Sequence, residues 1–387
     1  MLIRINTRLI DSIYIWMISL ALCLHVFNTF ELFEGFKAFY FPSACAFLIS
    51  IYKIAKYNRG HLYPIVWAFI LLTMVSAIVS RYSGAIGSAN TMMILIIGAY
   101  SLRYVDLKEF LAVNNILILV SLLGLFGGLI YGGIYNNFRF SGYYQDPNYF
   151  CTTLLLFIYI LMVSIYTTDK RILKIVNLVE IMLIILLVGL SVSRTGLVCV
   201  GLVMFVGLFT LYKKNKFITV LAVFAVSIAI TKIDFSLIFD LFNQRFIQAS
   251  DGVQSATALR FSLSKRFISE AFSSIDTGIL GLGIGSTIAP HQLGIIDISL
   301  HHRDHNTITS CLSEHGILAF MIFCYIHLRL ILNLCTTKWL RILRLVTYLS
   351  VLIFSASIWQ MTYLPWWMLI FLISNDGRYY NKCISNK

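Results

Sequence analysis

The sequence predicts an all-α polytopic integral membrane protein, a single membrane domain over residues 1–387 with about twelve transmembrane helices. Three observations predict this fold class. Hydrophobic residues make up 59% of the chain and charged residues only 12%, which excludes a set of soluble domains. Apolar stretches of about 18 residues or more recur from end to end, and each can cross a bilayer. The net charge of +13 lies in short basic clusters between these stretches, so we expect no nucleic-acid partner.

The predicted spans are joined by connections that are basic on one side of the membrane. A cluster such as Lys170, Arg171 and Lys174 is typical of a cytoplasmic loop. Every second connection carries such a cluster, so we expect both termini in the cytoplasm. The spans cover residues 11–30, 37–55, 62–80, 85–102, 110–133, 148–167, 173–192, 195–212, 217–233, 307–328, 340–358 and 361–375.

Two of the exoplasmic connections are long enough to carry function. One covers 134–147, and the other, between the ninth and tenth spans, covers 234–305. Loops of the second length are usually functional. Within it, 255–273 has the pattern of an amphipathic helix lying at the membrane interface. Its apolar positions, four residues apart, are Leu259, Leu263, Phe267 and Ala271.

Ten Lys and Arg residues remain on the exoplasmic side of this topology, where short loops are normally depleted of them. Seven of the ten are arginines. Because the planar guanidinium suits phosphate, we expect an anion site at the exoplasmic mouth. The ten residues are Lys37, Arg81, Arg139, Arg194, Lys232, Arg245, Arg260, Lys265, Arg266 and Arg303.

Arg139 lies shortly before the segment Asp146-Pro147-Asn148. This segment is a helix-start signal, with Asp146 or Asn148 as the cap. A helix N-terminus at the mouth presents unpaired N–H groups and a positive dipole end to an anion. Arg139 and Asn148 are therefore candidate site residues, although Arg139 could instead contact lipid headgroups.

Other candidate arginines lie in a tight turn and in the long loop. Arg194 follows Ser191-Val192-Ser193 almost directly after a span, so it must reach the headgroups or point into a cavity. Arg260 is best placed in the long loop, near the start of the amphipathic helix. For Arg266 a lipid phosphate is the alternative partner. The remaining candidates for substrate binding in this loop are Arg245 and Arg303.

A histidine cluster, 301–306, immediately precedes the tenth span. No paired carboxylate accompanies the cluster, and the eight cysteines form no Cys-x-x-Cys, so we expect no metal. Imidazole titrates near neutral pH, which makes His305 a candidate general base beside Asn306, a candidate binding residue. The alternative is a solvated histidine-rich loop.

Four motifs follow one another along the chain: Arg139-Phe-Ser-Gly142 with Pro147-Asn148; Ser193-Arg194-Thr-Gly196; Arg260 with Gly281-Leu-Gly283; and His305-Asn306 with Gly316-Ile-Leu-Ala319. In this order they resemble the motifs of the membrane O-antigen polymerases and O-antigen ligases of bacterial surface-polysaccharide assembly. The resemblance covers roughly 135–320, and Ala319 departs from it where the family has a second glycine.

The resemblance implies a GT-C-like glycosyltransferase in the bacterial plasma (inner) membrane, with its active site facing the periplasm. The implied donor is an undecaprenyl-diphosphate-linked oligosaccharide, so neither metal nor another cofactor is expected. By this analogy Arg139, Arg194 and Arg260 bind the diphosphate. His305 would deprotonate or orient the acceptor hydroxyl. Catalytic roles are thus expected for His305, Arg260 and Arg139.

Three functions remain open at this point. The segment around Arg139 favours polymerisation of repeat units into O-antigen or capsular polysaccharide, with a chain-length regulator as a possible partner besides the membrane lipids. An O-antigen ligase, which transfers the polymer to lipid A-core, is the alternative. A flippase for lipid-linked oligosaccharide belongs to another class, and it would need ionisable residues deep in several spans.

Overall fold

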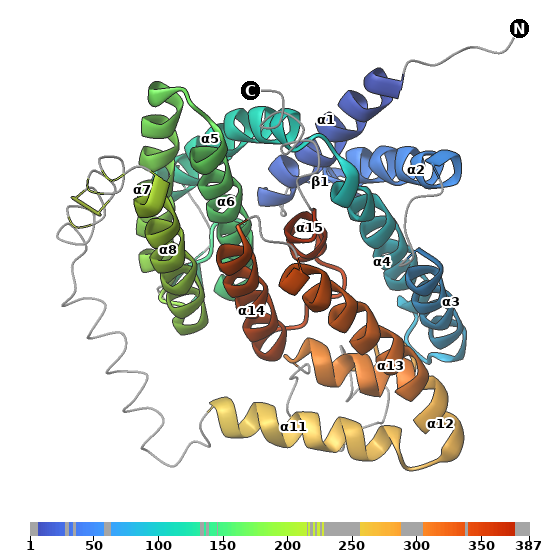
Figure 1. The fold of residues 1–387 in the computed structure, drawn as a ribbon. Coiled ribbons are helices and arrows are strands. Elements are labelled where there is room, and N and C mark those ends of the chain that lie inside the picture. The colour runs from blue at the N-terminus through green and yellow to red at the C-terminus, as the bar shows by residue number, and fades with distance from the viewer. Residues whose placement is uncertain are drawn as a thin grey trace, which may run out of the picture.

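Helices make up almost all of the structure, a computed structural model shown in Figure 1. The described residues are 7–27, 31–33, 36–57, 63–131, 135–136, 139–144, 146–214, 256–287, 305–336 and 340–375, with isolated positions between 216 and 227. The strands within these ranges form two short antiparallel hairpins. They pair β1 (Glu31–Phe33) with β2 (Phe36–Lys37), and β3 (Tyr135–Asn136) with β4 (Arg139–Phe140).

Most helices that follow one another along the chain pack side by side, as short connections between spans require. The first group is α1 (Thr7–Val26), α2 (Tyr40–Tyr57), α3 (Tyr63–Val79), α4 (Ala85–Tyr100), the 3₁₀ helix η1 (Ser101–Tyr104), α5 (Leu107–Tyr131), α6 (Pro147–Thr167), α7 (Arg171–Ser191) and α8 (Arg194–Lys214). The second group is α11 (Ala256–Ala271), α12 (Ile275–Leu280), α13 (Thr307–Thr336), α14 (Arg341–Ser357) and α15 (Leu364–Ile373).

The prediction of a helical fold with several helices long and apolar enough to cross a membrane is confirmed, but the predicted number of spans is not. Among the described residues, seven helices are long and apolar enough to cross a membrane, instead of twelve. They are α1, α4, α5, α6, α7, α8 and α13. Three further predicted spans correspond to shorter apolar helices in α2, α3 and α15, and α14 has 17 residues. The predicted span 217–233 lies almost wholly outside the described residues.

Helix α6 forms the centre of the fold. It contacts α5, α7, α8, α14 and α15, and Figure 1 shows it between the α7–α8 pair and the α14–α15 pair. Its residues are mostly apolar and are buried on every side, which is typical of a fully enclosed helix. All ten residues of α15 are buried as well. The outer helices α7 and α8 instead expose large apolar side chains such as Ile172 and Phe205, as lipid-facing helices do.

Helix α11 runs across the ends of neighbouring helices, along the lower edge of the view in Figure 1. It lies within the range 255–273 that the sequence assigned to an amphipathic helix. Leu263, Phe267 and Ala271 are buried, and α11 packs on α13. Lys265 and Arg266 lie on the exposed side. The period of four in the apolar positions thus becomes one buried face.

Helix α13 is interrupted where the sequence predicted a continuous span over 307–328. Gly316 adopts φ 76° and ψ 178°, a conformation outside the helical region. The loop 281–287 packs against this break, with the Leu282 N–H donating to Ser313 O at 2.8 Å and the Gly283 N–H to Glu314 O at 3.1 Å. Loop N–H groups therefore satisfy carbonyls that the interrupted helix leaves unpaired.

Candidate functional site

The N-terminus of α6 is capped as the sequence signal predicted. Of the two possible caps, Asp146 is the one used: its carboxylate accepts from the Asn148 N–H at 2.7 Å, and Pro147 occupies the first turn. Asp146 is extended and α6 begins immediately after it. The expected unpaired N–H groups are not present at this helix start, because the Tyr149 and Phe150 N–H groups donate to Asp146 O at 3.1 and 3.4 Å. What α6 presents at this end of the bundle is the positive end of the helix dipole.

The two arginine motifs around Arg139 and Arg194 meet at this helix start. Ser193 donates through Oγ to Asn148 Oδ1 at 2.6 Å, and Arg139 donates through Nε to Ser191 O at 3.0 Å. The turn between α7 and α8 is tight because Val192 takes a left-handed conformation, with φ 47°. Half-buried Arg139 and exposed Arg194 therefore lie at the same end of the bundle.

The N-terminus of α13 joins the same region through the loop 358–363, which connects α14 to α15. Thr307 Oγ1 donates to Ile358 O at 2.6 Å and accepts from the Gln360 N–H at 2.9 Å. Gln360 Nε2 in turn donates to Thr152 Oγ1, one turn into α6, at 3.2 Å. Half-buried His305, two residues before Thr307, is thereby held near the start of α6.

Asn306 has a structural role that the sequence analysis did not assign. Its Oδ1 accepts from the Ile308 N–H at 2.9 Å and from the Thr309 N–H at 3.3 Å, which makes it the N-cap of α13. The pair His305-Asn306 therefore places a histidine immediately outside a capped helix.

Aromatic hydroxyls line the same end of the bundle and fix its geometry. Tyr149 OH donates to Trp359 O, and Tyr363 OH donates to Tyr149 O at 2.6 Å. Tyr144 OH, in the loop before α6, lies 3.1 Å from Thr153 Oγ1. Burial raises the pKa of Tyr144 above its usual value, so the hydroxyl stays protonated, and it donates to His25 O at 3.0 Å.

The long-loop candidates divide into three groups. Arg260 lies in α11 one turn before Ser264, which accepts from Thr309 Oγ1 at 3.2 Å, so its backbone is close to the start of α13. Arg266 lies on the exposed side of α11, away from that contact. Arg245 and Arg303 lie outside the described residues.

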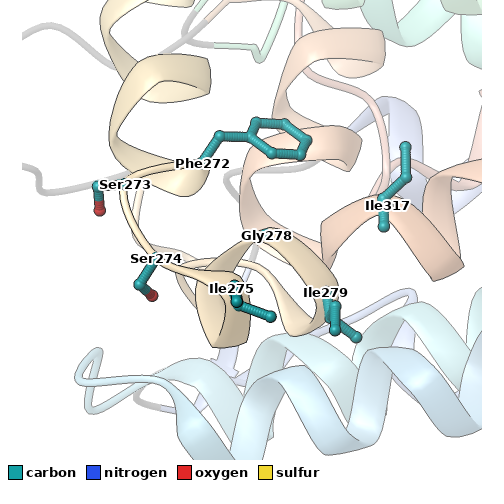
Figure 2. A pocket seen from close by; sticks show the side chains of 7 residues that line it. All are labelled: Phe272, Ser273, Ser274, Ile275, Gly278, Ile279 and Ile317. Atoms are coloured by element: carbon teal, nitrogen blue, oxygen red, sulfur yellow. The ribbon is translucent and has the colours of Figure 1, made fainter.

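A shallow pocket of about 400 Å³ opens elsewhere, at the turn between α11 and α12 (Figure 2). Its lining is apolar apart from two serines, and it contains no cation, so it has none of the chemistry expected of an anion site. We do not assign it to the candidate site. The lining residues are Phe272, Ser273, Ser274, Ile275, Gly278, Ile279 and Ile317.

The loop 358–363 is the part of the site that sequence reasoning missed. Its signal was weak: Gln360 is a polar residue between Trp359 and Met361, at the edge of a predicted span. No group of three or more His, Cys, Asp or Glu residues that could hold a metal ion occurs in the described part of the chain.

The chemistry of this region follows from its residues. Arginines beside a capped helix N-terminus can bind a phosphate or diphosphate. A histidine at the second helix start can accept a proton from a hydroxyl. The chain matches no protein-family model and no curated protein.

Proposed function

We propose that the protein transfers a glycosyl group from an undecaprenyl-diphosphate-linked oligosaccharide at the outer face of the bacterial plasma membrane, polymerising repeat units into a surface polysaccharide. One observation carries the proposal. Hydrogen bonds join Arg139 to the turn 191–196 and that turn to Asn148 at the start of α6, and Gln360 joins the segment 305–309 to Thr152 of α6. The sugar and the GT-C-like architecture come from the family resemblance.

In this proposal Arg139, Arg194 and Arg260 bind the lipid diphosphate. A hydroxyl of the acceptor attacks the anomeric carbon as the bond from that carbon to the diphosphate oxygen breaks, with inversion. The arginines and the α6 N-terminus stabilise the negative charge that develops on the leaving diphosphate. His305 takes the proton of the attacking hydroxyl. No metal is needed, because the cations neutralise the leaving group.

The proposal is tested by deleting the gene and complementing the strain with variants. If the protein is a polymerase, the deletion removes the polysaccharide ladder and leaves a single repeat attached to core. Arg139→Ala, Arg260→Ala and His305→Ala should each reduce the ladder at least 10-fold at normal protein level, since removing one group that stabilises developing charge typically costs about 10²–10³ in rate. Lys265→Ala, an exposed cation on α11, is the matched control and should restore the ladder.

Other outcomes would identify other functions. Loss of every repeat from core, with lipid-linked polymer accumulating, would identify a ligase. Accumulation of single lipid-linked repeats on the cytoplasmic face would identify a flippase. Full restoration of the ladder by all three alanine variants would show that the site proposed here is wrong.

A further inference from the structure

Gln360 occupies an unusual position in the described part of the chain. It lies in the loop 358–363 and is fully buried. Its backbone N–H donates to Thr307 Oγ1 at 2.9 Å, and its side-chain Nε2 donates to Thr152 Oγ1 at 3.2 Å. One residue therefore links the first residue of α13, two positions after His305, with the second turn of α6, beside Asn148.

The orientation of the Gln360 amide follows from its neighbours. Thr152 already donates its hydroxyl proton to Asn148 O at 3.0 Å, so it can only accept from Gln360. The group facing Thr152 must then be the NH₂ end, which leaves Oε1 on the other side. Among the described residues this buried oxygen has no hydrogen-bond partner.

An unpaired buried acceptor is unfavourable for folding, and an apolar side chain of the same length would avoid it. Local features that cost stability are expected at functional sites. The hydrogen bonds of Gln360 connect the two sides of the candidate site, which are the start of α6, near Arg139 and Arg194, and the start of α13, near His305. Its position thus points to a role in geometry and not in stability.

We propose that Gln360 is a positioning residue, which sets the distance between the His305 end of α13 and the phosphate-binding start of α6. This inference rests on the proposed function. It predicts that removing the bridge, the hydrogen bond from Gln360 Nε2 to Thr152 Oγ1, misaligns the general base His305 with the leaving diphosphate. A misplacement of about 1 Å is enough to cost on the order of 100-fold in rate.

The test compares four variants of the full-length protein in the deletion strain, by ladder intensity, protein level and thermal midpoint in detergent. Gln360→Met should reduce the ladder 10- to 100-fold without lowering the thermal midpoint, because it removes the unpaired oxygen together with the bridge. Thr152→Val removes the other end of the bridge and should reduce the ladder similarly. The double variant should be no worse than either single one, as expected for two ends of one contact. Asn333→Leu removes a hydrogen bond from a side-chain amide to Ser374 O at the opposite end of α13, and it should leave the ladder unchanged.

Two results would overturn the inference while the proposed function stands. The first is a normal ladder with Gln360→Met when Arg139→Ala and His305→Ala abolish it. The second is a ladder that falls only in proportion to the protein level, with a lower thermal midpoint, which is the result expected of a purely structural residue. A deletion strain with an unchanged polysaccharide would instead overturn both this inference and the proposed function.

Discussion

At the scale of single residues, a few buried hydroxyls join segments that are far apart in the chain. Ser193 is the clearest case, since it is fully buried, donates to Asn148 Oδ1 at 2.6 Å and accepts from the Gly196 N–H at 3.0 Å. Substituting it removes both bonds and leaves two buried polar groups unpaired. We expect Ser193→Ala to lower the free energy of unfolding by about 1–3 kcal/mol, measured by denaturation in detergent.

The control for Ser193 is an exposed serine at a turn. Ser273, between α11 and α12, is exposed, and Ser273→Ala should change the free energy of unfolding by less than about 0.5 kcal/mol. If the two substitutions changed the free energy of unfolding equally, the Ser193 hydrogen bond between the α7–α8 turn and α6 would not stabilise the fold.

At the scale of elements, the break in α13 and the glycine loop form one unit. A Cβ on Gly316 would lie 2.2 Å from Ile279 O, and one on Gly281 would lie 2.2 Å from Glu314 O, so each backbone fills the space beside the other. Thr287 also donates to the Glu314 carboxylate, through its N–H at 3.2 Å and through its hydroxyl. The loop and the half-helix Thr307–His315 thus hold each other in place.

This unit predicts a large effect for a small substitution. Gly316→Ala requires a positive φ at an alanine and a clash with backbone that cannot rotate away. The free energy of unfolding should fall by on the order of 4 kcal/mol or more. It is measured from the thermal midpoint and from the yield of monodisperse protein after extraction.

A second glycine provides the comparison. A Cβ on Gly201, within α8, meets no atom within 4 Å. Gly201→Ala should stabilise the protein by about 0.5–1 kcal/mol, because alanine restricts the unfolded chain more than glycine does. A Gly316→Ala protein as stable as Gly201→Ala would mean that α13 is continuous.

At the scale of the whole molecule, the site lies at one end of the bundle and the basic clusters at the other. Helix α6 begins at Pro147 in the candidate site and ends at Thr167 beside Lys170 and Arg171, about 31 Å away for its 21 residues. Helix α11 contacts α13, whose N-terminus is tied to α6 at the site end. The turn after α11 and the turn after α6 should therefore face opposite sides of the membrane.

Cysteine labelling tests this arrangement. In a cysteine-free background, Ser273→Cys should react with a membrane-impermeant maleimide in spheroplasts. Asp169→Cys, in the exposed turn between α6 and α7, should react only after permeabilisation. Labelling in the reverse order would invert the orientation and remove the basis for a periplasm-facing site.

Several features of the fold could be predicted from the sequence because they depend on neighbouring residues. Hydropathy over about 20 residues predicted the apolar helices, and Asp146-Pro147-Asn148 predicted the start of α6 to within two residues, with the structure selecting Asp146 as the cap. The number of spans was overestimated because several apolar stretches form helices of 17 residues or fewer. Hydropathy does not say where a helix stops inside a continuous apolar run.

What the sequence by itself determined is the class of molecule, a chain of apolar helices with basic connections, and the helix start at Asp146-Pro147-Asn148. These depend on composition and local spacing. Only the tertiary structure decided that Ser193 meets Asn148, that Gly316 interrupts α13 opposite Gly281, and that Gln360 links the two sides of the site. Each of these contacts joins residues at least 35 positions apart, and no local pattern specifies such a partner, because packing of the whole bundle selects it.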